Sequence, residues 1–248
     1  HVIPWANGTD ALQVAMMGLG LEPGDEVITA DFTFAATVEV IALLGLTPVL
    51  VDVDPNSFNI DTKAIERAIT TKTKAIVPVH LFGQVADMDA IMAIAEKHNL
   101  YVIEDNAQGI GATHTDANGN TTKTGGIGHV GSTSFFPSKN LGCYGDGGAI
   151  FTNDDDLAHT LRGIVNHGMY ERYHHDVVGV NSRLDSLQAV VLNEKLKLLD
   201  YYNERRKWTA IRYSQLLSDH DNIITPKVIR NCDSHVFHQY TIRLIGFD

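Results

Sequence analysis

One lysine stands in a sequence context that suits covalent chemistry. Lys139 follows a strand-like run at 132–136, and a glycine-rich stretch leads from it to a second apolar run at 148–152. Three apolar or aromatic residues surround it in sequence: Phe136, Leu141 and Tyr144. Burial penalises the ammonium form, which lowers the pKa of a lysine and makes its amine a nucleophile toward an aldehyde. The competing interpretation is a solvated lysine in a hairpin loop.

Two other stretches hold residues that suit a flat, phosphorylated ligand. Gly8 and Thr9 begin a predicted helix, where free N–H groups and a hydroxyl bind phosphate. Phe34 follows a predicted strand at 26–30 and offers a ring for stacking. Each residue has an ordinary alternative, a plain helix cap for Gly8 and Thr9 and a core aromatic for Phe34.

Two adjacent acids, Glu104 and Asp105, end a predicted strand at 100–104. Successive side chains of a strand point to opposite faces, so one acid can face a ligand while the other turns away. The carboxyl ends of parallel strands border the crevice in which α/β sheets bind ligands. The alternative is a carboxylate that caps the next turn. A lysine, an acid, phosphate donors and a ring are together what pyridoxal 5′-phosphate requires.

Composition excludes several classes of partner. The chain has 248 residues, of which 44% are hydrophobic and 20% charged, as in ordinary globular proteins. Its net charge of −11 disfavours nucleic acid and anionic membranes as partners. No apolar run approaches the roughly 20 residues that span a bilayer. The two cysteines are too few for a disulfide framework and favour a reducing, cytoplasmic location.

Short apolar strands alternate with helical segments along the chain, which predicts an α/β fold with a mostly parallel sheet covered by helices. Helices are expected at 9–19, 34–44, 61–69, 87–98, 155–165 and within 185–217. Further strands are expected at 48–54 and 74–80. Residues 113–126 are predicted to be a surface excursion and 166–182 to be irregular. Residues 235–244 are expected to form one strand that begins a new unit.

Three further patterns carry no prediction of a site. The glycine spacing at 126–131 matches a dinucleotide fingerprint, but a polar loop precedes it and a strand follows, so its context is wrong. The run that starts at Asp116 lacks the glycine and the glutamate of a calcium loop. The twelve histidines are scattered, with pairs only at 174–175 and 235/238, and they are interpreted as ordinary polar residues. No metal is expected.

Seven stretches resemble the sugar-nucleotide aminotransferases of the DegT/StrS type, a branch of the fold-type I pyridoxal-phosphate enzymes. They are Asn7–Leu12, Pro23–Ile28, Thr33–Thr37, Ile76–Gly83, Glu104–Gln108, Ser134–Lys139 and Gly179–Ala189. The resemblance implies a large cofactor-binding domain at 1–217 and the start of a small α+β domain at 218–248. Relative to that family, an N-terminal segment and most of the small domain are expected to be missing.

The resemblance also implies roles for individual residues. Lys139 resembles the lysine that bonds the cofactor, Asp105 the partner of its pyridine nitrogen, Gln108 a contact on the 3′-oxygen side and Phe34 the stacking ring. Gly8, Thr9 and Ser134 resemble phosphate donors. Asn181 resembles an asparagine that reaches the phosphate of the neighbouring subunit, which implies a homodimer with composite active sites.

Three stretches, 143–153, 172–175 and 179–183, resemble the 3-aminotransferases of UDP-2-acetamido-2-deoxy-3-oxo-glucuronate, which serve polysaccharide biosynthesis. Arg183 resembles an arginine that crosses to the neighbouring subunit and lies near the sugar acid; a structural salt bridge is the alternative. The amino donor implied is L-glutamate. Other possibilities left open are a dTDP- or UDP-linked 3- or 4-keto-6-deoxy sugar as substrate, and a non-catalytic regulatory protein on the same scaffold.

Overall fold

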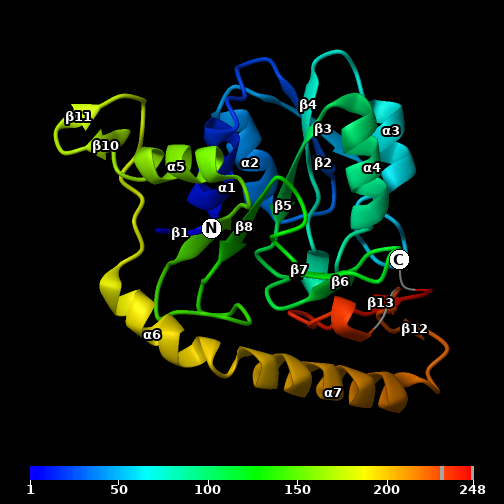
Figure 1. Cartoon of the computed structure of the whole chain (residues 1–248). Coiled ribbons are helices and arrows are strands. Elements are labelled where there is room, and N and C mark those ends of the chain that lie inside the picture. Colours follow the sequence, from blue (N-terminus) through cyan, green and yellow to red (C-terminus); the bar gives the residue numbers. More distant parts are fainter. Residues whose placement is uncertain (230–231, 247–248) are drawn as a thin grey trace.

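A seven-stranded sheet forms the centre of the molecule in a computed structural model that describes residues 1–229 and 232–246 (Figure 1). The strand order is β1-β9-β8-β5-β4-β2-β3. Strands β3, β2, β4, β5 and β8 run parallel, whereas β9 is antiparallel to both β8 and β1. The expected α/β class with a mostly parallel sheet is therefore confirmed.

The sheet strands are β1 Val2–Trp5, β2 Glu26–Ala30, β3 Thr47–Val51, β4 Thr73–Val77, β5 Tyr101–Asp105, β8 Val130–Ser134 and β9 Gly148–Phe151. The helices are α1 Gly8–Gly18, α2 Ala35–Leu43, α3 Thr62–Ala68, η1 Leu81–Gly83, α4 Met88–His98, α5 Asp155–Ile164, α6 Ser186–Leu196, α7 Leu199–Leu217 and η2 Cys232–Ser234. Three small pairs complete the list: β6 Thr113–Thr115 with β7 Thr121–Lys123, β10 Met169–Glu171 with β11 His174–His175, and β12 Ile223–Ile224 with β13 Arg243–Leu244.

Each face of the sheet has its own core. Val27 and Ile103 pack with α1, α2 and α5, whereas their neighbours Ile28 and Val102 pack with α3 and α4. The alternation follows from the period of two in a strand, and it explains why these strands are apolar throughout. Figure 1 shows the two helical layers on either side of the sheet.

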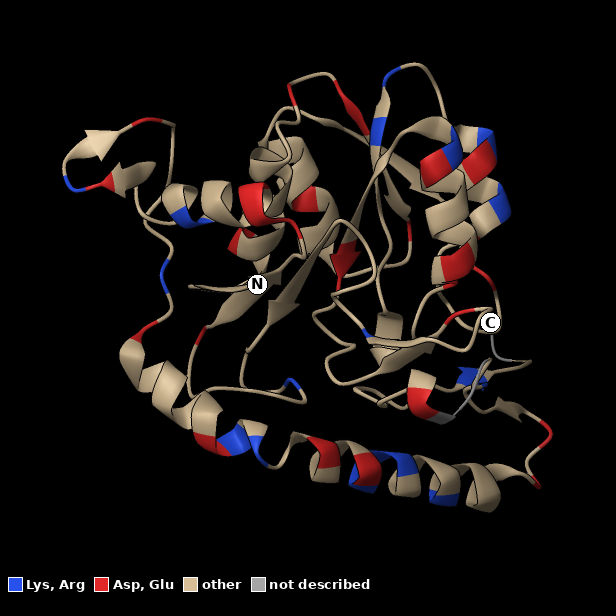
Figure 2. Cartoon of the chain, in the orientation of Figure 1, with Lys and Arg blue, Asp and Glu red and all other residues tan. Residues whose placement is uncertain are grey.

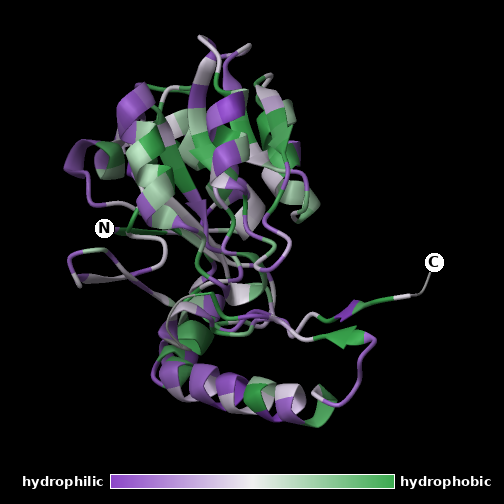
Figure 3. Cartoon of the chain, turned by 90° about the vertical axis from the view of Figure 1, so that its right-hand side faces the viewer, coloured by the Kyte–Doolittle hydropathy of each residue, from purple (hydrophilic) through white to green (hydrophobic). Residues whose placement is uncertain are grey.

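Helices α6 and α7 form a separate layer below the carboxyl ends of the strands (Figures 1 and 3). Leu192 and Leu199 pack against Phe135, Leu141 and Cys143 of the segment that joins β8 to β9. Most of α7 faces solvent and carries both signs of charge, as Figure 2 shows. The contact matters because it encloses the loop on which Lys139 stands.

Residues 113–126 lie mostly at the surface, as expected, although they hold the hairpin β6–β7 and bury His114 and Thr124. The Thr124 hydroxyl donates to the Gly109 carbonyl at 2.7 Å. Residues 166–182 are largely irregular, as expected, and include the short hairpin β10–β11. One local expectation was wrong. Residues 235–244 are not one strand: His235 forms an isolated bridge with Gln84 and β13 pairs with β12, while the backbone turns between them at Phe237, where φ is 46°.

Strand β1 was not expected from the sequence. Its buried residues Ile3 and Trp5 alternate with exposed Val2 and Pro4, and the strand pairs with β9 at the edge of the sheet. Edge strands accept proline because one side of the strand needs no donor. No helix of the described part of the chain is long and apolar enough to cross a membrane.

The division at residue 217 stays a prediction. The segment that follows η2 contacts the large unit closely: the Val236 N–H donates to Gly83 and the Val85 N–H donates to Ser234. Val236 is buried in the same core as Ile28 and Val102.

Candidate active site

A cavity of about 620 Å³ opens at the carboxyl ends of the central strands. The start of α1, the start of α2, the end of β5 and the loop after β8 all contribute to its walls. Seven of the residues singled out from the sequence line it: Gly8, Thr9, Phe34, Asp105, Gln108, Ser134 and Lys139. Residues separated by up to 131 positions in the chain thus meet at one opening.

Lys139 is half-buried at the cavity wall. Its ammonium has no hydrogen-bond or ion-pair partner among the described residues, although its backbone N–H donates to the Phe136 carbonyl at 2.9 Å. Burial lowers the pKa of Lys139, and the nearby carboxylate of Asp105 offsets part of that shift. The expected shielding by Tyr144 was wrong, because that ring is exposed and lies under the Lys195 ammonium.

Asp105 ends β5 and is 4% exposed. Its Oδ2 accepts from the Thr37 hydroxyl at 2.8 Å, and its Oδ1 accepts from the Ala107 N–H at 3.1 Å. These two donors fix the carboxylate while it borders the cavity. An acid held in this way can accept an N–H from a ligand without moving.

The first turn of α1 presents unused donors. Asn7 caps the helix: its side chain accepts from Asp10 and its carbonyl accepts from Ala11. The N–H groups of Gly8 and Thr9 have no acceptor among the described residues. A Cβ on Gly8 would lie 2.6 Å from the Cβ of Ser134, so only glycine lets the helix start approach that hydroxyl. Free N–H groups at a helix start bind phosphate well.

Phe34 and Gln108 also line the cavity. The ring of Phe34 lines the cavity but is 70% exposed, so it is not a core residue. The Gln108 Oε1 accepts from the Phe82 N–H, which orients the side-chain amide. Its Nε2 hydrogens are then the groups left for a ligand.

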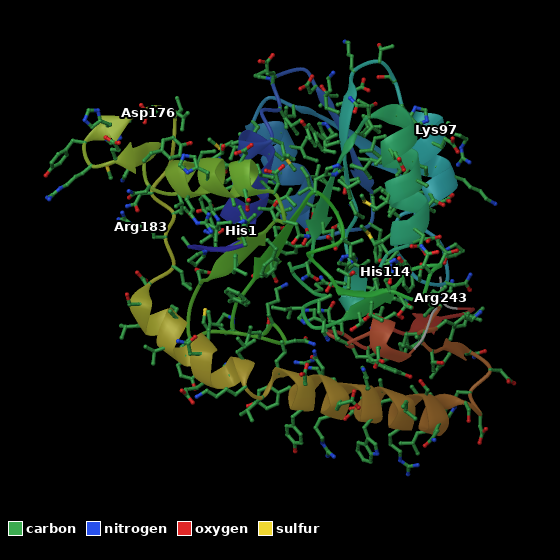
Figure 4. All side chains as sticks on the ribbon, in the orientation of Figure 1. His1, Lys97, His114, Asp176, Arg183 and Arg243 are labelled. Carbon is green, nitrogen blue, oxygen red and sulfur yellow. The ribbon has the colours of Figure 1, made fainter. Side chains whose placement is uncertain are left out.

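Two predicted residues do not reach this cavity. Asn181 lies in an exposed segment and forms an isolated bridge with Asn166. Arg183 is exposed, and its guanidinium donates to the Asn166 Oδ1 at 2.8 Å. Figure 4 labels Arg183 on the segment that leads from the β10–β11 hairpin to α6. Their predicted roles across a subunit boundary stay predictions.

Sequence reasoning missed His238, which lines the cavity beside Lys139. Burial and the positive charges of Lys139 and Arg206 lower the pKa of His238 to about 4. A single histidine has no spacing signal, so its part in the cavity could not be read from the chain. Among the described residues, His, Cys, Asp and Glu form no group of three that could hold a metal ion.

A family model described as the DegT/DnrJ/EryC1/StrS aminotransferase family matches residues 1–246. The chain belongs to this family. Among curated proteins, it is 52% identical to a "Pleiotropic regulatory protein" of Geobacillus stearothermophilus, covering 98% of this chain and 64% of the relative. It is also 52% identical to a UDP-2-acetamido-2-deoxy-3-oxo-D-glucuronate aminotransferase of Pseudomonas aeruginosa, covering 98% of this chain and 66% of the relative. The chain thus spans less than two thirds of these relatives.

Solved structures share the fold over nearly all of the chain. A DegT/DnrJ/EryC1/StrS aminotransferase from Brucella abortus is 46% identical with a TM-score of 0.92, over 99% of this chain and 66% of that one. The NtdA structure from Bacillus subtilis, with bound cofactor PMP, is 36% identical with a TM-score of 0.88, over 98% of this chain and 55% of that one.

Aminotransferases of this family carry pyridoxal or pyridoxamine phosphate, and the cavity fits such a group. It offers an amine without a partner at Lys139, a fixed carboxylate at Asp105 and unused helix donors at Gly8 and Thr9. Glycine at position 8 also lets the start of α1 lie close to the Ser134 hydroxyl, which is a further donor at this end of the cavity. The donor set therefore matches an aldehyde-bearing, cationic, phosphorylated ring.

Proposed function

We propose that this chain is the cofactor-binding part of a pyridoxal-phosphate-dependent aminotransferase that acts on a keto sugar nucleotide. The observation that carries the proposal is the meeting of Lys139 and Asp105 in one cavity, with the free N–H groups of Gly8 and Thr9 at its edge. Pyridoxal phosphate, when bound, supplies an electron sink for the carbon next to an amino group. The remaining chemistry falls to the chain.

Each cavity residue has a distinct part in that chemistry. Asp105 holds a cationic ring nitrogen through its ionised carboxylate, while Thr37 keeps that carboxylate in place. Lys139, with its pKa lowered by burial, would take the proton from the α-carbon of the amino donor and, as an acid, deliver it to the carbon that belonged to the aldehyde. Gly8 and Thr9 would hold the phosphate through their free N–H groups, and the Phe34 ring would be available to stack on the cofactor.

The proposed amino donor is L-glutamate and the proposed acceptor is UDP-2-acetamido-2-deoxy-3-oxo-glucuronate, as in polysaccharide biosynthesis. The likeness to the Pseudomonas aeruginosa aminotransferase supports this acceptor. Arg183 is the proposed ligand of the sugar carboxylate, and Asn181 the proposed donor to a partner's phosphate. Both lie on an exposed segment away from this chain's own cavity, as a cytoplasmic homodimer with shared sites would require.

A second candidate is a regulatory protein that binds the cofactor without turnover, and the relative named "Pleiotropic regulatory protein" is the reason to test it. Amino transfer separates the two. The full-length protein is incubated with glutamate and 3-keto or 4-keto sugar nucleotides, and a new amino sugar is sought by mass spectrometry. A regulatory protein binds pyridoxal phosphate but forms no amino sugar.

Cofactor binding is tested with Lys139→Ala in the full-length protein. Wild type is expected to absorb near the visible edge and to gain the mass of the cofactor after borohydride reduction, because the Lys139 amine bonds its aldehyde. Lys139→Ala loses both signals. The control is Lys97→Ala on the far surface of α4, where the ion pair with Glu66 is exposed and both signals should remain. A variant at 139 that keeps both signals contradicts the proposal.

A further inference from the structure

His238 is held in the cavity wall from two sides. Arg206 of α7 donates to the carbonyl oxygens of Phe237 and His238, at 3.2 and 3.1 Å. On the other side, the Gln239 N–H donates to the Phe82 carbonyl at 3.3 Å. These hydrogen bonds fix the backbone at position 238 between α7 and η1. A fixed backbone helps to hold the His238 ring in one direction.

A chain of side-chain amides fixes which ring nitrogen of His238 carries hydrogen. The Asn203 Nδ2 donates to the Ile110 carbonyl at 3.2 Å, so its Oδ1 is free to accept. The Asn140 Nδ2 donates to that Oδ1 at 2.8 Å and to the Val236 carbonyl at 3.2 Å. The Asn140 Oδ1 therefore faces the His238 Nδ1 at 3.2 Å. An amide oxygen can only accept, so the His238 Nδ1 must carry the hydrogen.

The second ring nitrogen, Nε2, is left as an acceptor. It has no hydrogen-bond partner among the described residues, and it is not one of the fully buried polar atoms that lack a partner. It is therefore accessible from a cavity, and each of the two cavities that His238 lines, of about 620 and 610 Å³, also has Lys139 in its wall. Burial and the positive charges of Lys139 and Arg206 lower the pKa of His238 to about 4, so the ring stays neutral near pH 7.

We propose that His238 is a positioning residue for Lys139, with its Nε2 accepting an N–H of the lysine amine and directing that amine toward the reacting carbon. The proposal rests on the proposed transaminase function and deepens it. The Lys139 amine has no hydrogen-bond partner among the described residues, and the unused acceptor of His238 belongs to the wall of the same cavity. The His238 Nε2 can accept from Lys139 in either charge state, because the neutral amine and the ammonium each have an N–H to donate.

His235 provides a matched comparison in the same segment. It too is buried, and burial lowers its pKa to about 4. Its ring stacks on Phe237 at 3.8 Å between centroids, and its Nδ1 accepts from the Phe237 N–H. It does not line the cavity of Lys139. A substitution at His235 therefore reports what the loss of a buried histidine does to this segment alone.

The variants are made in the full-length protein loaded with pyridoxal phosphate. His238→Asn keeps an N–H for Asn140 and removes the Nε2 acceptor, whereas His238→Gln places an amide near the Nε2 position. We expect His238→Asn to slow the glutamate half-reaction by about 10- to 100-fold, since misplaced reacting groups cost about that much. We expect an unchanged KM for glutamate, unchanged cofactor absorption, and partial recovery in His238→Gln. Wild-type rates in His238→Asn, or equal losses in His238→Asn, His238→Gln and His235→Asn, overturn the proposal.

A second measurement does not depend on activity. Nitrogen-15 NMR of labelled histidines in the cofactor-free full-length protein, assigned through His238→Asn, reports the tautomer directly. We expect a neutral ring with hydrogen on Nδ1 from pH 6 to 8. Hydrogen on Nε2, or a charged ring at pH 7, overturns the inference whatever the enzyme does. If wild type fails to bind pyridoxal phosphate, the proposed function fails, and the NMR result then still decides the state of His238.

Discussion

Two neighbouring carboxylates on β5 differ in how many hydrogen bonds they receive. Glu104 is fully buried, and both of its oxygens are used. Its Oε1 accepts from the N–H groups of Ile127 and Gly128, each at 2.7 Å, and its Oε2 accepts from the Gly125 N–H at 2.8 Å. The fourth donor is the His80 Nε2, at 2.9 Å. No capacity remains for a ligand.

Asp105, one residue later, points to the other face and receives two donors, Thr37 and Ala107. Its remaining capacity borders the cavity. The comparison teaches that burial alone does not identify a functional acid. A saturated carboxylate ties loops together, whereas one with unused lone pairs beside a cavity can hold a ligand.

The largest expected effect comes from Asp105→Asn. We expect turnover of the full-length enzyme to fall by about 10²- to 10³-fold, because the charge that stabilises the cationic ring is lost while the shape is kept. The melting temperature should change little, because the new amide oxygen can accept from the Ala107 N–H while its NH₂ donates to the Thr37 hydroxyl, which can also accept. Steady-state kinetics beside a thermal melt check this. A variant that melts far below wild type but turns over normally when folded would reverse the roles of the two acids.

Glu104→Gln should destabilise the fold rather than alter chemistry. The His80 Nδ1 accepts from the Ala86 N–H at 3.2 Å, so the His80 Nε2 carries hydrogen and donates to Glu104. A glutamine would set its NH₂ against two donors, which costs about 3 kcal/mol of unfolding free energy. Urea unfolding measures it, and the cofactor absorption of the folded variant should match wild type.

The pH dependence of unfolding gives a second measure of Glu104. Burial alone would raise its pKa, but hydrogen bonds from His80 and from backbone N–H groups hold that pKa below its ordinary value of 4.5. The stability it contributes is therefore present above pH 4.5 and is lost as the pH falls toward the lower folded-state pKa. The difference in stability between wild type and Glu104→Gln should shrink below pH 4.5. A constant difference down to pH 3 would contradict this.

A smaller effect is expected from Gly8→Ala at the cavity edge. Its Cβ would stand 2.6 Å from the Ser134 Cβ, so the start of α1 must shift and its N–H groups lose their alignment. We expect affinity for pyridoxal phosphate to fall about tenfold, since overpacking costs about 1–3 kcal/mol. Absorbance titration measures it. Gly126→Ala, where the nearest atom is 3.5 Å away, is the control that should bind normally.

Much of the scaffold was predictable because each strand carries its own local signal. The strand expected at 26–30 is β2 and has the same bounds in the structure. Asp61 caps α3, as expected for an aspartate that precedes a helix. The strand β1 and the turn at Phe237 were missed. The first depends on pairing with β9, nearly 150 residues away, and the second on the contact of its neighbours with η1.

The sequence by itself determined the alternation of strands and helices, the family, and the residue types that could hold a phosphorylated aldehyde. The period of the hydrophobic residues, the positions of glycines and the spacing of motifs are local properties, so they can be read from the sequence without the fold. Only the tertiary structure showed why Asp105 has capacity left for a ligand and Glu104 has none, and that His238 lines a cavity with Lys139. Hydrogen-bond saturation and ring tautomers depend on which distant groups the folded chain brings within about 3 Å.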